Sequence, residues 1–177
     1  MIWNDKMLTA WATAGGVTPF DSECVNPASL DLRLGNTIRI PCQYWSLLGS
    51  DPVSKKTLSS KLWQAPQPFE TFVLWPGHLV LCHSLEHTHI PLNACAMLLS
   101  KSSTGRLGLE HLHAGWGDPG FSGQWVFELK NLAPWPITLV AGERYMQLSL
   151  ASMAEEPLRD YSVTGRYQGQ VGPEAHR

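Results

Sequence analysis

The sequence predicts a mostly β domain, built from short strands in a sandwich or barrel, with one short helix near the N-terminus. Thirteen prolines and fifteen glycines are distributed along the 177 residues, and this frequency argues against long helices. Short apolar or alternating runs recur between them at fairly regular spacing, which is typical of sandwiches and barrels. With 44% hydrophobic and 16% charged residues, the chain has the composition of a folded domain with its own core.

The predicted elements follow one another along the chain. The helix is expected in MLTAWATAGG (7–16), because its glycine pair can end it. In SLDLRLG (29–35), the apolar Leu30, Leu32 and Leu34 alternate with polar residues, which is the period of a half-buried strand. Further strands are predicted in FVLWPG (72–77), HLVLCHSL (78–85), AMLLSKSS (96–103), GQWVFELKN (123–131), PITLVAGE (136–143) and RYMQLSLA (144–151).

Charge and hydropathy exclude several functional classes. Thirteen basic and fifteen acidic residues give a net charge of -2, and no block of like charge occurs. The chain therefore lacks the electrostatic footprint of a protein that binds duplex nucleic acid or an anionic membrane. No apolar run approaches the length of a membrane span. The first residues include Asp5 and Lys6 and lack the apolar segment of a signal peptide, so we expect a cytoplasmic protein.

Seven histidines require zinc binding to be weighed. The candidates are His83, His87, His89, His111 and His113. However, neither H-x-E with P-C-x-x-C nor HExxH occurs, and the four cysteines form no C-x-x-C pair. We therefore expect no bound zinc, and we interpret these histidines as surface residues or hydrogen-bonded core residues.

The stretch SKSSTGRLGL (100–109) carries two cations and several hydroxyl groups directly after a predicted strand. Lys101, Ser102, Ser103 and Arg106 are set around glycines, and charge-assisted hydrogen bonds of this kind suit a triphosphate. The P-loop pattern GxxxxGK[ST] is missing. An ordinary polar turn explains the local sequence equally well.

Two carboxylates stand out in AGWGDPGFSGQWVFE (114–128). Asp118 lies in a glycine- and proline-rich turn, where aspartate is common. Glu128 ends an apolar strand, and the alternation places it on the face opposite Trp125 and Phe127. A buried carboxylate is costly, so Glu128 is either paired, protonated or functional, unless it reaches solvent at the strand end.

The C-terminal segment DYSVTGRYQGQVGPEAHR (160–177) has too little apolar content to form a core element. One interpretation is a frayed terminus, which is common. The other is a flap that closes on a polar ligand, because aromatic and hydrogen-bonding side chains are set between its glycines. These side chains are Tyr161, Arg166, Tyr167, Gln168 and Gln170.

Five motifs, in the same order along the chain, resemble those of the dCTP deaminases, the homotrimeric relatives of the dUTPases. They are VNPASLDLRLGN (25–36), FVLWPGHLVLCHSLEHTHIP (72–91), SKSSTGRLGL (100–109), AGWGDPGFSGQWVFELKN (114–131) and GRYQGQVGP (165–173). The resemblance implies a distorted jelly-roll or β-clip barrel of the dUTPase-like type over residues 1–160. It also implies a tail, 161–177, that closes over the active site, and a trimer with active sites at subunit interfaces.

The implied activity is hydrolytic deamination of dCTP to dUTP and ammonia. In this family a glutamate, and not zinc, activates the water, which assigns the role of general base to Glu128. Ser102 and Arg106 would flank that carboxylate, and Arg106 would hold the attacking water in place. Magnesium would be bound through the nucleotide phosphates.

The same resemblance assigns roles in nucleotide binding. The backbone around Leu112 and Ala114 would read the edge of the base, and Asp118 would accept a hydrogen bond from the sugar hydroxyl. Two sets of residues would bind the phosphates. The loop would contribute Lys101, Ser102, Ser103 and Arg106, and the tail would contribute Tyr161, Arg166 and Gln170.

Departures from the family pattern leave more than one function open. Lys101 stands where arginine is usual, which replaces a bidentate phosphate contact by a point charge. Gly117 replaces an apolar residue, which is expected to loosen the turn before Asp118. The A-G-W sequence at 114–116 looks like that of the bifunctional deaminase–dUTPases, which release dUMP and pyrophosphate. The sequence is also compatible with a modified deoxycytidine substrate, with dUTP or dTTP as product or effector, and with a non-catalytic nucleotide-binding regulator.

Overall fold

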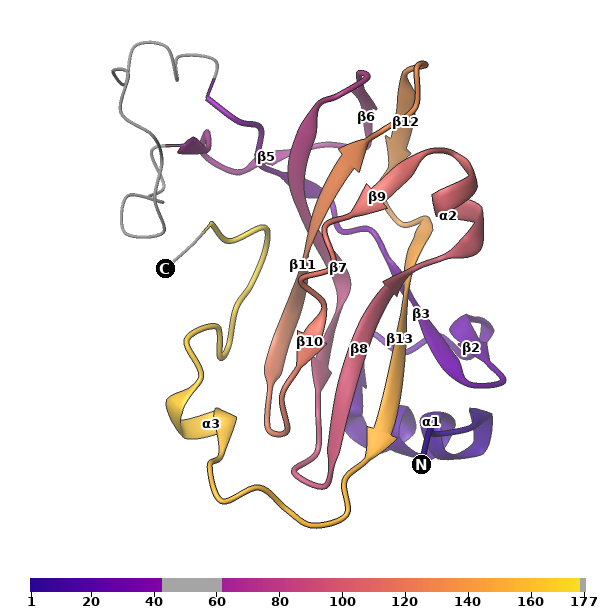
Figure 1. Ribbon diagram of the computed structural model, residues 1–177, viewed down its shortest axis with the longest axis vertical. Helices are drawn as coiled ribbons and strands as arrows, with labels where there is room; N and C mark the ends of the chain where they lie inside the picture. The colour runs from indigo at the N-terminus through magenta and orange to yellow at the C-terminus, as the bar shows by residue number, and fades with distance from the viewer. Residues whose placement is uncertain (43–61, 176–177) are drawn as a thin grey trace.

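The computed structural model describes residues 1–42 and 62–175, and its regular structure is mostly β (Figure 1). The strands of this described part form two larger sheets and two ribbons. One sheet has the strand order β1 (Val17–Thr18), β7 (Leu79–His89), β11 (Ser122–Asn131), β9 (Leu109–His111). The other has the order β10 (Trp116–Gly117), β8 (Ala94–Ser100), β13 (Arg144–Ser152), β3 (Ser29–Arg33), β2 (Val25–Asn26). The ribbons are β12 (Ile137–Val140) with β6 (Thr71–Leu74), and β4 (Thr37–Ile38) with β5 (Gln67–Pro68).

The predicted N-terminal helix is present as α1 (Asp5–Trp11), which a π-helical turn, η1 (Ala12–Gly16), continues. Asn4 caps its start, since its side chain accepts a hydrogen bond from the backbone N–H of Met7. Gly15 has a φ of 95°, a left-handed conformation that glycine adopts at little cost. The prediction that the glycine pair ends this helix is confirmed.

The remaining helical elements are single turns: η2 (Ser22–Cys24), α2 (Ser102–Arg106) and α3 (Tyr161–Thr164). The strand predicted over 96–103 therefore ends at Ser100, and the predicted polar turn after it takes the form of the short helix α2. Among the described helices, none is long and apolar enough to cross a membrane.

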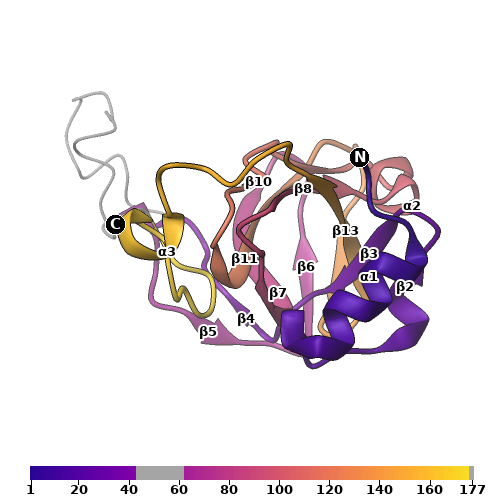
Figure 2. The ribbon, with the colours of Figure 1, turned by 90° about the horizontal axis from the view of Figure 1, so that it is seen from below.

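The two larger sheets enclose one apolar interior. Seen along the strands, they surround a common space, with α1 on one side of the molecule and α3 on the opposite side (Figure 2). Leu98 of β8 and Leu148 of β13 pack in the same buried cluster as Phe127 and Leu129 of β11. Burial of these apolar side chains is the main force that holds the sheets together.

Strand β3 departs from the predicted alternation at Asp31. The pattern placed this residue on a solvent-facing side, but only 2% of it is exposed. β3 lies between β13 and β2, and the Asp31 carboxylate accepts a hydrogen bond of 2.9 Å from Asn26 and another from Lys101. These partners compensate for the cost of burying the charge. Because they come from other parts of the chain, the alternation of apolar and polar residues in this strand does not reveal them.

Strand β11 follows the predicted alternation. Trp125 and Phe127 are buried, whereas Val126 and Glu128 are only partly buried on the other face. The register with β7 shifts between Gln124 and Val126, and there the backbone N–H of Trp125 donates to the hydroxyl of Ser84 at 2.8 Å. Past this irregularity, Glu128 pairs with Leu81 of β7. The neighbouring strand therefore fixes the backbone position of Glu128.

Candidate active site

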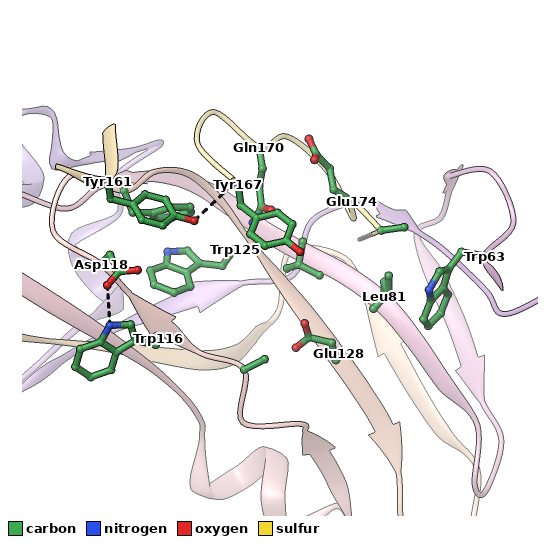
Figure 3. Close-up of a pocket in the computed structure, with 14 residues that line it drawn as sticks. Trp63, Leu81, Trp116, Asp118, Trp125, Glu128, Tyr161, Tyr167, Gln170 and Glu174 are labelled. Atoms are coloured by element: carbon green, nitrogen blue, oxygen red, sulfur yellow. Dashed lines mark hydrogen bonds between the residues drawn. The ribbon is translucent and has the colours of Figure 1, made fainter. Parts of the chain in front are cut away.

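A cavity of about 370 Å³ opens between β10, β11 and the C-terminal tail, residues 161–175 (Figure 3). Its walls are largely aromatic, from Trp63, Trp116, Phe121, Trp125, Tyr161 and Tyr167. Its polar side chains are Asp118, Glu128, Gln170 and Glu174. A mostly apolar cavity with a few convergent polar groups is the usual form of a small-molecule site.

Glu128 lies inside this cavity, and its side chain is 26% exposed. In Figure 3 the carboxyl points from β11 into the space below Tyr167 and Gln170. Burial raises the pKa of Glu128 from 4.5 to about 7, because the charged form loses hydration. A carboxyl with this pKa exchanges a proton readily at neutral pH, as a general base must.

His111 lies directly beside Glu128 on the neighbouring strand β9. Its Nδ1 is 3.2 Å from Oε2 of Glu128, and 2% of the residue is exposed. Burial, together with the nearby His113, lowers the pKa of His111 to about 4, so the imidazole is neutral at pH 7. The sequence pointed to His111 only as a zinc candidate. Its proximity to Glu128 depends on the β9–β11 register, which pairs His111 with Leu129.

Asp118 lies at the other end of the cavity, in the turn between β10 and β11. The indole N–H of Trp116 donates to its Oδ1 at 3.0 Å. Gly117 between them has no space for a side chain, since a Cβ there would lie 2.4 Å from the Trp125 ring. The glycine thus allows Trp125 to pack closely against β10, and the expectation that it loosens the turn before Asp118 stays a prediction. Trp116 and Trp125 were not among the predicted site residues.

The tail is bound to the start of β11 by reciprocal hydrogen bonds. Gln170 Nε2 donates to the carbonyl of Gln124 at 2.6 Å, and the N–H of Gln124 donates to the carbonyl of Gln170 at 3.0 Å. The Gln124 side chain accepts from the N–H of Gly172 at 2.7 Å, and Arg39 donates to the carbonyl of Pro173 at 2.7 Å. These contacts place Gln170 at the cavity wall.

The predicted site residues fall into two groups in the described part of the chain. Five of them line the cavity: Ala114, Asp118, Glu128, Tyr161 and Gln170. The others do not line it: Lys101, Ser102, Ser103, Arg106, Leu112 and Arg166. Apart from Lys101, the members of this second group are exposed.

Lys101 is engaged within its own chain. Its ammonium contacts the buried carboxylate of Asp31, and Arg144 Nη1 lies 3.8 Å from that carboxylate. Lys101 is the N-cap of α2, the turn that carries Ser102 and Arg106. Its ion pair therefore anchors the start of this turn.

The histidines do not gather into a metal site within the described residues, where no group of three potential ligands is found. His83 is buried and bound on both nitrogens, to the Thr37 hydroxyl and the Ser84 carbonyl, each at 2.8 Å. His113 is exposed and pairs with Glu110 at 3.1 Å.

Comparison with known proteins identifies related chains. A family model described as dCTP deaminase-like matches residues 3–153. Relatives from Mycolicibacterium vanbaalenii and Mycobacterium avium, both named "dCTP deaminase, dUMP-forming", are 42% identical over 185 residues, which covers 100% of this chain and 95% of each relative.

A solved structure supports the fold. The 2'-deoxycytidine 5'-triphosphate deaminase from Agrobacterium tumefaciens matches with a TM-score of 0.66 at 24% identity. The match covers 84% of this chain and 47% of that chain, so this chain spans about half the length of the solved protein.

Proposed function

The chain belongs to the dCTP deaminase-like family, and we propose that it converts dCTP to dUMP, releasing ammonia and pyrophosphate. The observation that carries this proposal is Glu128, a carboxyl with a pKa raised to about 7 inside an aromatic cavity. From the sequence alone, dUTP was the expected product and dUMP the alternative. The names of relatives at 42% identity favour that alternative, the dUMP-forming reaction.

In the proposed deamination, Glu128 takes one proton from water and delivers it to N3 of the cytosine ring while the hydroxide adds to C4. The second proton of that water passes from the new hydroxyl through Glu128 to the amino group. The C4–N bond then breaks, ammonia leaves and the C4 carbonyl forms. Each step needs Glu128 first as a base and then as an acid, which a pKa near neutrality allows.

The cavity supports a nucleotide bound in one orientation. The base would lie near Ala114 and Glu128, and the sugar hydroxyl would donate to Asp118, whose Oδ1 the Trp116 indole already fixes. Gln170 and Tyr161 of the tail would cover the ligand. Magnesium would arrive as part of the nucleotide complex, held by phosphate oxygens, as is usual for this ion.

The phosphate-binding residues would come from a second subunit. Ser102, Ser103 and Arg106 are exposed on α2 and do not line their own chain's cavity. Leu99, Leu107 and Leu112, which lie close to α2 in the chain, are between 44% and 48% exposed. An exposed apolar surface beside the exposed cation Arg106 fits a subunit interface, so we propose a homotrimer in which α2 of one subunit completes the site of another.

The proposed function is tested by incubating the protein with dCTP and magnesium and separating the products by chromatography. Equal amounts of dUMP, pyrophosphate and ammonia are expected, with little free dUTP. Accumulation of dUTP without pyrophosphate would instead support a protein that only deaminates. Tight binding of dCTP with no product at all would favour the non-catalytic regulator.

A further inference from the structure

His111 is buried against Glu128, and its ring nitrogens make no hydrogen bond of normal geometry within the described residues, although a contact with the Glu128 backbone slightly opposes the fall in its pKa. Nδ1 lies within hydrogen-bonding distance of Oε2, at 3.2 Å, but the two groups are not aligned for a hydrogen bond. Both nitrogens of His111 and Oε2 of Glu128 are therefore unsatisfied within the described residues. An unpartnered buried imidazole is unfavourable, and an aliphatic side chain would fill the same space without that cost.

The pair is not an ion pair. Burial drives the pKa of His111 down to about 4 and that of Glu128 up to about 7, the opposite of what two stabilised charges would show. His111 is thus neutral at pH 7, with one nitrogen as donor and the other as acceptor. A neutral donor can hold a carboxylate in place without cancelling its charge, which leaves the carboxylate able to accept a proton.

His111 does not belong to the cavity wall, so it cannot touch the nucleotide directly. Its ring packs edge-on against Phe127, with ring centroids 6.4 Å apart, on the core side of β9. Glu128 is the group between His111 and the ligand. Any effect of His111 on the reaction must therefore act through Glu128.

We propose that His111 is a positioning residue for Glu128, whose Nδ1–H turns onto Oε2 and directs the other carboxylate oxygen, Oε1, toward the attacking water. This proposal rests on the proposed function. In the step itself the water proton moves to Oε1, the oxygen of the resulting hydroxide bonds to C4, and His111 keeps its own proton. After protonation, Oε2 is still an acceptor, so the same hydrogen bond holds Glu128 while it returns the proton.

Other ionisable groups around His111 are few. On its own strand and the following loop they are Glu110 and His113, which pair with each other at 3.1 Å. Across the sheet, β11 contributes Glu128 and Lys130, of which Lys130 is opposite Glu110. The turn α2 contributes Arg106, and the ionisable residue of β8 is Cys95.

The test compares His111→Phe, which keeps a ring without a donor, with His111→Asn, whose amide can donate from near the Nδ1 position. We expect His111→Phe to lower kcat for dCTP about 10- to 100-fold, because a hydrogen bond to a charged group is lost, with little change in KM. The Glu128 carboxyl should titrate at a pH about 1 higher, since the donor no longer favours its charged form. His111→Asn should recover most of both effects.

The titration is read by 13C NMR of glutamate-labelled protein, with Glu128 assigned from the signal missing in Glu128→Gln. Leu109→Val is the matched control, since Leu109 is fully buried on the same strand; it should lower thermal stability without moving the titration. If His111→Phe does not fold, His111→Leu takes its place.

The possible outcomes distinguish a failure of the His111 proposal from a failure of the proposed deaminase function on which it rests. If the wild-type protein binds dCTP but does not deaminate it, the proposed function is wrong, and the NMR titration still shows whether His111 acts on Glu128. An active wild type whose His111→Phe variant titrates and turns over unchanged overturns the inference. Equal losses in the Phe and Asn variants also overturn it, because they indicate packing alone.

Discussion

Glu128 lies on an apolar strand, yet water can reach its carboxyl, and this environment gives the residue its chemistry. The side chain is 26% exposed, so water reaches it, yet burial raises its pKa to about 7. A carboxyl at its ordinary pKa of about 4.3 would be a weak base toward water at neutral pH. Within a single chain, the strand therefore raises the pKa of Glu128 by desolvation, and no charged neighbour is among the causes of the shift.

Replacing Glu128 by Gln keeps the volume but removes the proton acceptor. We expect deamination to fall by about 10²- to 10⁴-fold, the range lost with general acid–base catalysis. Binding of dCTP should persist, since one negative charge near an anionic ligand is removed. Glu110→Gln is the matched control, because Glu110 lies on the adjacent strand and contacts exposed His113 instead. Wild-type turnover by Glu128→Gln, measured as ammonia release, would show that the carboxyl is structural.

The raised pKa of Glu128 also predicts how stability depends on pH. Its pKa is higher in the folded protein than in the unfolded chain, so its contribution favours folding below pH 4.5 and is lost as pH rises to about 7. Glutamine does not titrate. The stability of the wild type relative to Glu128→Gln should therefore fall by roughly 3 kcal/mol across that window.

Urea unfolding of the wild type and of Glu128→Gln at a series of pH values measures this difference. Subtracting the two curves cancels the titrating groups that are distant from Glu128, whereas His111, only 3.2 Å away, is not cancelled and contributes with the opposite sign through its lowered pKa. A difference that stays flat with pH would mean that Glu128 is solvated in the folded protein.

At the scale of elements, the site depends on how the tail is held against β11. Gln124 and Gln170 exchange two hydrogen bonds, and Gly123 leaves space for the tail backbone. A Cβ at position 123 would lie 3.1 Å from both the nitrogen and the oxygen of Gln170. A methyl group at this position would therefore press on the tail backbone without removing any residue that lines the cavity.

Gly123→Ala is therefore expected to loosen the tail and to raise KM for dCTP up to about tenfold, with the fold retained. Val171→Ala is the control, since the Val171 side chain is 69% exposed and its loss leaves the tail backbone intact. Limited proteolysis should cut the tail faster only in Gly123→Ala. A variant with a protected tail and unchanged KM would contradict the proposed covering role.

Periodicity explains why most strands could be predicted from the sequence. Alternation marked β3 and β11, and glycine marked the end of α1, because these signals are local. The docking of the tail could not be read in this way, since 161–175 pair with β11 through backbone and amide groups that follow no apolar period. The same holds for Asp31, whose burial depends on Lys101, seventy positions further along the chain.

The site shows the same division. Glu128 and Asp118 stand out in the sequence, one on a strand and one in a turn. His111 was singled out only as a zinc candidate, because its importance lies in the β9–β11 register that brings it to Glu128. Trp116 was missed although it lies only two positions from Asp118, because the sequence does not show that its indole donates to that carboxylate. The chemically important carboxylates were therefore predictable, and the side chains that contact them were not.

At the scale of the whole molecule, the cavity of a single chain holds the proposed base but not the α2 residues that are proposed to bind the phosphates. Arg106 and Ser102 lie on an exposed turn, beside the apolar side chains Leu107 and Leu112, which are nearly half exposed. The Glu128 cavity is formed elsewhere on the chain, between β10, β11 and the tail. We therefore expect sedimentation to show a stable trimer at micromolar concentration, and a monomer would contradict the shared-site proposal.

Shared sites make a sharper prediction, in which two inactive proteins restore each other. Arg106→Ala and Glu128→Gln should each be inactive as pure trimers. In a trimer assembled from both, one interface joins a subunit with intact Glu128 to a neighbour with intact Arg106, so each mixed trimer should regain one working site. Co-expression with two affinity tags isolates these mixed trimers, and ammonia release from dCTP measures their activity.

Mixing Glu128→Gln with Glu128→Ala is the control, since no interface in such trimers contains the base. If the Arg106→Ala mixture is as inactive as this control, the two residues serve the same subunit, and the assignment of α2 to a neighbouring site is wrong.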